Sequence, residues 1–253
     1  MAQSERNPES QWFGRRSVSP QEKTRMVLGV FDSVAGKYDL MNDVMSGGIH
    51  RLWKNRLIRE INPRPSLSYL DVAGGTGDIA FRIHKATHGA APITVCDINA
   101  SMLEVGQDRA LDKGIVKGME WVLGNAEKLP FKDNSFDVYT IAFGLRNVTR
   151  IDDALREAYR VLKPGGRFFC LEFSHVEPEA LQKIYDLYSF NVIPRMGKLI
   201  ANDADSYQYL VESIRAFPDQ ETLAQRLLEA GFDEAHYTNL TFGVAAIHEA
   251  WKL

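Results

Sequence analysis

Residues 70–78 read LDVAGGTGD, an apolar run that contains an aspartate and then gives way to three glycines and a threonine. Gly74, Gly75 and Gly77 permit positive φ angles and leave backbone N–H groups exposed at the start of a following helix. The stretch therefore predicts a strand, a tight turn and a helix. We expect a ligand to approach the backbone closely at this turn.

Short apolar runs alternate with helical patterns from residue 68 onward. Strands are expected over 68–74, 93–99, 119–126, 136–144 and 167–174. Helices are expected over 81–88, over 100–113 with Asn99 as N-cap, and from 151 until Pro164-Gly165-Gly166 ends the pattern. The alternation predicts an α/β fold with a parallel sheet covered on both faces. In such sheets, ligands bind beyond the carboxyl ends of the strands, at the topological switch point.

The C-terminal third of the chain is less regular. A helix is expected over 219–232, with Asp219 as N-cap and Gly231 after its last turn, followed by a β-hairpin to the C-terminus. We divide the chain into a disordered leader, 1–22, and a single domain, 23–253. Segments 23–60 and 176–216 are expected to cover the active site.

Composition excludes several classes of protein. The net charge of −3 and the pI near 6.1 argue against a nucleic-acid binder. Cys96 and Cys170 lie in apolar runs and are expected to be core residues rather than a disulfide or a metal pair. The histidines show no metal spacing, so no metal is expected. No apolar stretch approaches the roughly 18 residues of a membrane helix, and the polar leader does not resemble a secretory signal.

The residues after the glycine turn point to a nucleoside cofactor. Asp97 ends the second strand 20 residues after Gly77, where a carboxylate can bind two ribose hydroxyls. NAD would bring a pyrophosphate close to Asp78, whereas S-adenosyl-L-methionine carries a cationic sulfonium and no phosphate, for which Asp71 and Asp78 would be favourable. The latter fits better, and a turn without a ligand ranks below both.

The end of the third strand, GNAEKLPF, adds to this interpretation. Asn125 can offer its side-chain amide, and Ala126 its backbone N–H, to an adenine edge. Ala126 is also small enough for the ring to lie close. Taken alone, this could be an ordinary polar turn; between Asp97 and the next strand it favours adenosine binding.

Two long stretches, YDLMNDVMSGGIHRLW (38–53) and RVLKPGGRFFCLEFS (160–174), resemble the signatures of the ubiquinone/menaquinone biosynthesis C-methyltransferase family. DVAGGTGD, CDIN, GNAEKLPF and FGLRNVT match it in order and spacing. The resemblance implies a class I S-adenosylmethionine-dependent methyltransferase (Rossmann-like) fold. Its cofactor contacts fall on Thr76, Asp97, Asn125 and Ala126, beside the glycines of the turn. Ala142 stands where bacterial members often have Ser, so no hydroxyl contact is expected there.

The implied reaction methylates a ring carbon of a polyprenylated quinol. Ionising an adjacent hydroxyl makes that carbon nucleophilic, so the protein must stabilise a phenolate and hold the carbon in line with the methyl group. We expect Arg146, Asn147 and Tyr38 to serve catalysis. Arg146 could instead only form an ion pair with Asp39 or Glu172. The expected substrate contacts are Asp39, Asn42, His50, Tyr185 and Tyr188.

VCDINASMLEVG, CLEFSHV and YDLYSFNVIP look more like the mitochondrial ubiquinone branch of the family. We therefore expect a methoxy-benzoquinol substrate and a peripheral site on the matrix side of the mitochondrial inner membrane, with any targeting sequence absent from this chain. A homodimer and a membrane-associated complex with other quinone-biosynthesis proteins are also expected. Demethylmenaquinol methylation, another small-molecule methyltransferase, a dehydrogenase and a non-catalytic scaffold remain alternatives.

Overall fold

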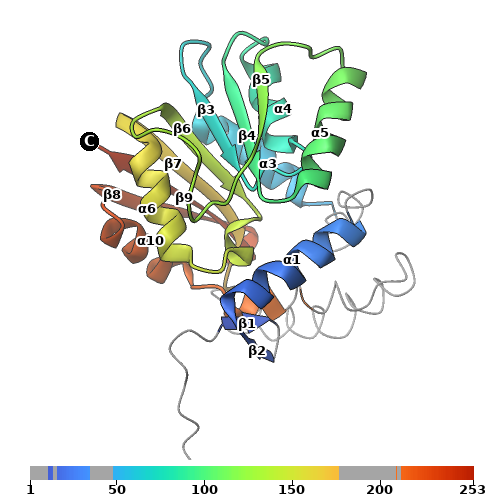
Figure 1. Cartoon of the computed structure of the whole chain (residues 1–253). Coiled ribbons are helices and arrows are strands. Elements are labelled where there is room, and N and C mark those ends of the chain that lie inside the picture. Colours follow the sequence, from blue (N-terminus) through green and yellow to red (C-terminus); the bar gives the residue numbers. More distant parts are fainter. Residues whose placement is uncertain (1–10, 14–15, 35–47, 177–208, 210–211) are drawn as a thin grey trace, which may run out of the picture.

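The computed structural model describes residues 11–13, 16–34, 48–176, 209 and 212–253 (Figure 1). Seven strands form one sheet, in the spatial order β5 (Met119–Leu123), β4 (Ile93–Asp97), β3 (Tyr69–Val72), β6 (Phe136–Ala142), β7 (Leu162–Phe173), β9 (Ala245–Lys252) and β8 (Glu234–Leu240). The first five are parallel, and β9 is antiparallel to both of its neighbours. The predicted α/β sheet and its C-terminal β-hairpin are confirmed.

The order in which the chain adds strands to the sheet changes direction between β3 and β6, which are neighbours in space. β4 and β5 lie on one side of β3, and β6 and β7 lie on the other. The crossovers therefore diverge at the carboxyl ends of β3 and β6. This is the topological switch point, where open α/β sheets leave a crevice for a ligand.

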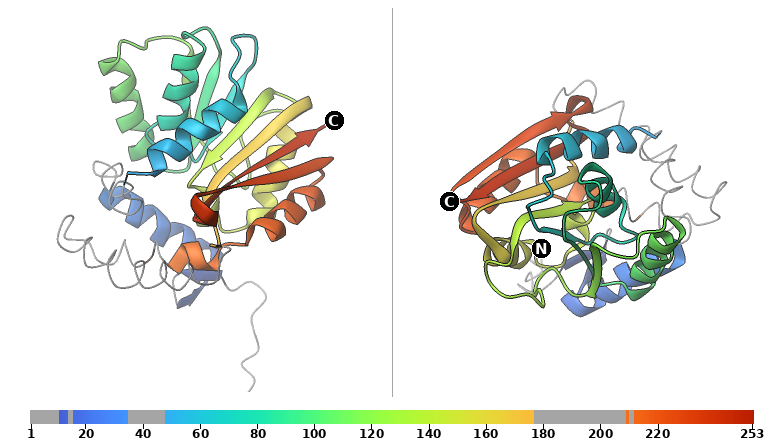
Figure 2. Two further views of the ribbon diagram at one scale, coloured as in Figure 1. Left: turned by 180° about the vertical axis from the view of Figure 1, so that it is seen from behind. Right: turned by 90° about the horizontal axis from the view of Figure 1, so that it is seen from above.

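Helices cover both faces of the sheet (Figure 2). One buried cluster joins the sheet to α3 (His50–Ile61) and α4 (Asp78–Ala86), and also includes Leu103 of α5 (Ala100–Asp112). The other joins the opposite face to α6 (Ile151–Val161) and α10 (Gln220–Glu229). Both faces of a parallel sheet must be covered in this way because its strands are apolar on both sides.

The predicted helix ends are confirmed where local capping decides them. Asn99 Oδ1 accepts a hydrogen bond from Met102 N (3.0 Å) at the start of α5. Asp219 Oδ1 accepts one from Thr222 N (2.8 Å) at the start of α10. Gly231, after the end of α10, has a φ of 113°, the conformation that favours glycine after a helix.

Strand β7 differs from the prediction. It begins at Leu162, directly after α6, and runs through the Pro164-Gly165-Gly166 segment. Leu162 pairs with Phe136 and Arg167 pairs with Val138, so the ladder is interrupted between these two pairs. The extra residues between these pairs form a β-bulge or similar irregularity in the ladder. The turn propensity of Pro164-Gly165-Gly166 predicts the interruption but not that strand pairing begins before it.

The N-terminal region differs from the predicted leader. Within 1–22, β1 (Gln11–Phe13) and β2 (Arg16–Val18) pair in an antiparallel ribbon, and α1 (Pro20–Val34) begins before residue 23. Trp12, Phe13 and Val18 are residue types that favour strands, but the polar average composition of the segment obscured them. Ser19 Oγ accepts from Glu22 N (3.3 Å) and caps α1, with Pro20 in its first turn.

Only part of the expected cover lies within the described residues. α1 lies across the carboxyl ends of the strands (Figure 1), whereas α3 packs into the core through Trp53, Leu57 and Ile61. Residues 35–47, 177–208 and 210–211 of the two cover segments lie outside the described residues. Among the described residues, no helix has the length and apolarity needed to cross a bilayer.

Candidate active site

The glycine turn brings the backbone of β3 close to β4. A Cβ atom at Gly74 would lie 2.7 Å from Val95 Cγ1 and 2.9 Å from the Asp71 carbonyl oxygen, so only glycine fits. Gly75 and Gly77 have φ angles of 53° and 82°, and Gly77 is the N-cap of α4. The turn thus leads directly into α4 and presents its backbone N–H groups at the switch point.

Asp97, at the end of β4, is tied to this turn. Its Oδ2 accepts from Gly75 N and its Oδ1 from Asn99 N, both at 2.8 Å. Burial raises the pKa of Asp97, and the backbone hydrogen bonds act against that rise. The carboxylate therefore holds two backbone segments together, and its remaining acceptor capacity is available to a ligand hydroxyl.

Asn125 and Ala126 follow β5 on the neighbouring wall. Asn125 Oδ1 accepts from Glu127 N (2.9 Å), so the oxygen of the side-chain amide closes its own turn. Ala126 is buried, whereas Asn125 is exposed. Thr76, in the turn, is also buried, and its Oγ1 accepts from Arg109 Nη1 on α5 (2.9 Å).

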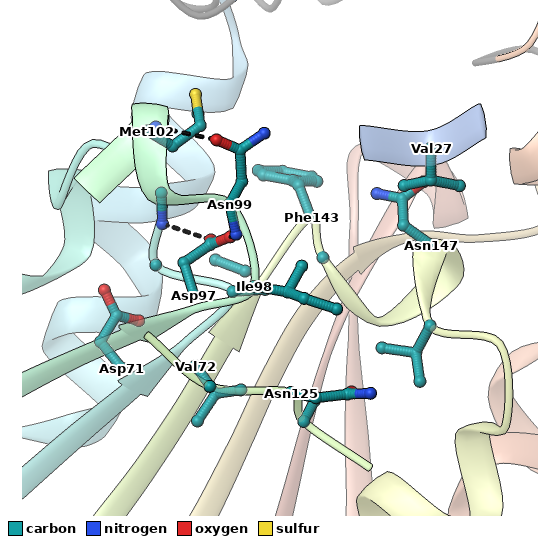
Figure 3. Close-up of a pocket in the computed structure, with 18 of the residues that line it drawn as sticks. Val27, Asp71, Val72, Asp97, Ile98, Asn99, Met102, Asn125, Phe143 and Asn147 are labelled. Atoms are coloured by element: carbon teal, nitrogen blue, oxygen red, sulfur yellow. Dashed lines mark hydrogen bonds between the residues drawn. The ribbon is translucent and has the colours of Figure 1, made fainter. Parts of the chain in front are cut away.

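These residues line one pocket at the switch point (Figure 3). It contains the predicted cofactor contacts Gly74, Gly75, Thr76, Asp97, Asn125 and Ala126, and the predicted catalytic residue Asn147. Gly77 shapes the turn but is not among the lining residues. Sequence reasoning missed a wall formed by Thr24, Val27 and Leu28 of α1. Their i, i+3, i+4 spacing marks a helix face but does not indicate what that face contacts.

Asp71, near the end of β3, is fully buried and lines the pocket. Its Oδ1 accepts from Thr140 Oγ1 (2.8 Å), whereas Oδ2 has no hydrogen-bond partner among the described residues. Burial raises the pKa of Asp71 to about 7, and the Thr140 hydrogen bond and the nearby Ala80 N–H act against this rise. A buried carboxylate oxygen without a partner is costly, and a cationic ligand group would satisfy it.

The charge of Asp78 is already paired with two cations within the protein. Its Oδ2 lies 2.6 Å from Lys54 Nζ, and its Oδ1 lies 2.9 Å from Arg82 Nε. Burial would raise the pKa of Asp78, but the two cations lower it overall. The repulsion expected between Asp78 and a pyrophosphate is therefore largely cancelled, and Asp71 is the carboxylate that favours a cation here.

Arg146 lies in the 3₁₀ turn η2 (Leu145–Asn147), directly after β6. Its Nη1 donates to Glu172 Oε1 (2.7 Å) and to the Phe143 carbonyl (2.5 Å), and its guanidinium carbon lies 5.5 Å from the Phe173 ring centroid. Nε and Nη2 are buried and have no partner among the described residues. The ion pair with Glu172, one of the two considered from sequence, is present, and it leaves Nε and Nη2 without a hydrogen-bond partner among the described residues in a fully buried side chain.

A second pocket lies on the other side of η2. Arg146 and Tyr209 line it, and it shares Val148 and Thr149 with the first pocket. The Tyr209 hydroxyl donates to Asn147 Oδ1 (3.1 Å), which links the two pockets, and burial raises the pKa of Tyr209 to about 12. Tyr209 is a site residue that sequence reasoning missed, because no motif joins it to the sheet.

Several predicted residues are not brought together here. Tyr38, Asp39, Asn42, Tyr185 and Tyr188 lie outside the described residues. His50 is buried at the start of α3 and is not among the described residues lining either pocket. In the part of the chain that is described, no three His, Cys, Asp or Glu side chains group as metal ligands would; the expectation of a metal-free site stays a prediction.

Solved structures share this fold. A SAM-dependent methyltransferase from Aquifex aeolicus superposes with a TM-score of 0.59 at 16% identity, over 79% of this chain and 89% of that one. A SAM-dependent methyltransferase from Thermotoga maritima gives a TM-score of 0.61 at 19% identity, over 89% and 99%. The predicted class I S-adenosylmethionine-dependent methyltransferase fold is therefore confirmed.

The sequence comparisons define the family. The model of the ubiE/COQ5 methyltransferase family matches residues 18–252. The ubiquinone/menaquinone biosynthesis C-methyltransferase UbiE of Brucella abortus (strain S19) is 58% identical over 243 residues, which cover 95% of this chain and 90% of that protein. UbiE of Dinoroseobacter shibae is 58% identical over 241 residues, covering 95% and 96%. The chain belongs to the ubiE/COQ5 methyltransferase family, which confirms the predicted resemblance.

Proposed function

We propose that this protein transfers a methyl group from S-adenosyl-L-methionine to a ring carbon of a polyprenylated methoxy-benzoquinol in ubiquinone biosynthesis. The observation that carries the proposal is the pocket at the switch point. Within a member of the ubiE/COQ5 family, it brings the glycine turn, Asp97 and the Asn125-Ala126 pair together. The relatives named above are C-methyltransferases of the same biosynthesis.

The pocket residues fit each part of this cofactor. Asn125 and Ala126 would hold the adenine, and Asp97 would accept from the ribose hydroxyls. The amino-acid tail would then lie beside the glycine turn, where the unpartnered Asp71 oxygen suits its ammonium group. When bound, S-adenosyl-L-methionine supplies a methyl group on a cationic sulfur, which is already activated for transfer.

Arg146 and Asn147 are the residues that we assign to the quinol, which accepts the methyl group. The unpartnered Nε and Nη2 of Arg146 can donate to a quinol oxygen and stabilise the phenolate that makes the ring carbon nucleophilic. Glu172 holds the guanidinium in position. Arginine stays protonated, so we assign removal of the ring proton to a water molecule that Arg146 orients. Tyr38 is proposed to bind a quinol oxygen.

Demethylmenaquinol is the alternative acceptor, because the relatives are named for the biosynthesis of both ubiquinone and menaquinone. The two acceptors differ in their rings, so a direct comparison distinguishes them. The purified protein is incubated with S-adenosylmethionine carrying a labelled methyl group and with either a demethylated methoxy-benzoquinol or a demethylnaphthoquinol of short prenyl tail. Mass spectrometry should detect label on the benzoquinol ring carbon. Label on neither ring would contradict the proposal and would favour a scaffold.

We also infer a peripheral position at a membrane surface, because a polyprenylated substrate resides in the bilayer, with Tyr185 and Tyr188 at the tail entrance. The more specific expectation of the matrix side of the mitochondrial inner membrane came from three sequence stretches. The relatives named above are bacterial and give it no support. A homodimer within a larger biosynthetic complex remains part of the proposal, which gel filtration of the purified protein and of a membrane extract can test.

A further inference from the structure

Lys54, on α3, is a buried lysine beside the cofactor pocket. Only 4% of its side chain is exposed, and it lines the pocket together with Gly74, Gly75 and Asp78. Neither the glycine turn nor the strand ends involve α3, so no motif points to this residue. A buried ammonium is costly unless charges and hydrogen bonds compensate it.

The charge around Lys54 is not balanced within its own cluster. Asp78 lies between two cations, Lys54 Nζ at 2.6 Å and Arg82 Nε at 2.9 Å. One carboxylate and two cations leave a net charge of +1 next to the pocket. An anionic ligand group would balance this excess.

The ammonium of Lys54 also has unused hydrogen-bonding capacity. It carries three donors, and among the described residues Asp78 accepts one of them. Its Nζ also lies 5.9 Å from the ring centroid of Phe143, another pocket residue. The remaining donors belong to a side chain that lines the pocket, so a ligand can accept from them.

The opposite charge is present in the same part of the pocket. Asp71 is buried, with its Oδ2 unpartnered, and Asp78 is near enough to Asp71 to affect its pKa. An excess positive charge at Lys54 and an unpartnered carboxylate oxygen at Asp71 therefore line the same pocket, with Asp78 close to both. This arrangement is complementary to a zwitterion, and an α-amino acid is one.

We propose that Lys54 binds the carboxylate of the methionine part of S-adenosyl-L-methionine, while Asp71 binds its ammonium group. The proposal rests on the proposed function and assigns one specific contact in that site. Lys54 thereby selects a cofactor that carries a free carboxylate. The alternative, a structural lysine that only neutralises Asp78, makes a different prediction.

Two ligands separate these roles: S-adenosylmethionine and decarboxylated S-adenosylmethionine, which differ only in the carboxylate. Calorimetric titration, without acceptor, measures the affinity of each for the purified wild-type protein and for Lys54→Met. A charge-assisted hydrogen bond predicts that the wild type prefers S-adenosylmethionine by about tenfold or more. Lys54→Met should lose that preference, with the affinity for the decarboxylated ligand nearly unchanged.

Arg82→Gln is the matched control, because it removes the other cation from Asp78 and leaves Lys54 in place. Because it also removes one of the two cations that give the cluster its excess charge, it should lower the preference only in part and leave it well above that of Lys54→Met. Lys54→Arg should keep part of it. Lys54→Met variants that retain the full preference, or that lose both ligands equally while still folded by circular dichroism, would overturn the proposal. Failure of the wild type to bind S-adenosylmethionine at all would instead overturn the proposed function.

Discussion

At the scale of single residues, Asp97 has a structural role as well as its proposed role in binding. It accepts from Gly75 N and Asn99 N, so it fixes the glycine turn and the start of α5. Asp97→Ala removes the ribose acceptor and both of these bonds, and should leave no measurable binding of S-adenosylmethionine. Asp97→Asn keeps an oxygen for Gly75 but loses the charge, and should bind about ten- to hundredfold more weakly.

Calorimetric titration measures both variants of Asp97, with thermal unfolding as a control for the fold. Wild-type affinity in Asp97→Asn would show that the ribose hydroxyls have another partner.

Asp71 predicts a pH dependence of cofactor binding. Its pKa of about 7 lies far above the ordinary value because the side chain is buried. Below that pH the free protein holds a neutral carboxyl group, which must lose its proton to pair with the cofactor's ammonium. Affinity should therefore rise roughly tenfold or more between about pH 5.5 and pH 7.5. Asp71→Asn should weaken binding and flatten this dependence in calorimetric titrations; an equal slope in the variant would assign the dependence to another group.

At the scale of elements, the sequence predicts what short-range interactions decide. The glycine turn, the Asn99 and Asp219 caps and the alternation of strands and helices are local features, and each was predicted correctly. Long-range pairing decides the rest. The continuation of β7 through Pro164-Gly165-Gly166 depends on β6, and the pairing of Asp78 with Lys54 depends on how α3 packs against α4. The sequence around β7 does not identify β6 as its partner, and the sequence around Asp78 does not identify Lys54.

The ion pair between η2 and β7 combines stability with the proposed catalysis. Removing Arg146 alone leaves Glu172 buried without its cation, which should cost about 3–5 kcal/mol of the free energy of unfolding. Arg146→Met combined with Glu172→Gln removes both charges and should recover most of that stability. If Arg146 stabilises the phenolate, methyl transfer stays strongly reduced in the double variant while S-adenosylmethionine still binds. Urea unfolding and single-turnover methylation measure the two effects, and restored turnover would reduce Arg146 to a structural residue.

At the scale of the whole molecule, the pocket draws on the elements packed against both faces of the sheet. One hydrophobic cluster joins the sheet to α3 and α4, and the other joins it to α6 and α10. The pocket includes Lys54, from α3 on the first face, and Thr149, just before α6 on the second. The geometry of the site therefore depends on the packing of both faces against one sheet, which explains why residues far apart in the sequence complete it.

His248 predicts how the stability of this whole assembly changes in acid. It is buried on β9, and its Nε2–H donates to the Gln220 carbonyl (2.9 Å) at the start of α10. Burial lowers its pKa from 6.5 to about 4, so the folded protein binds this proton less readily than the unfolded chain does. The contribution of His248 is intact above about pH 6.5 and is lost as the pH falls towards 4, by about 3 kcal/mol in total. Buried carboxyl groups with raised pKa values, such as Asp97 and Glu172, change stability in the opposite direction over part of this range. Comparing wild type with His248→Gln removes their effect, because both proteins contain these carboxyl groups. Urea unfolding at several pH values measures the free energy of unfolding of each, and the difference between the two should shrink or reverse by about this amount from pH 7 to pH 4. A constant difference would show that His248 is not buried as a neutral imidazole.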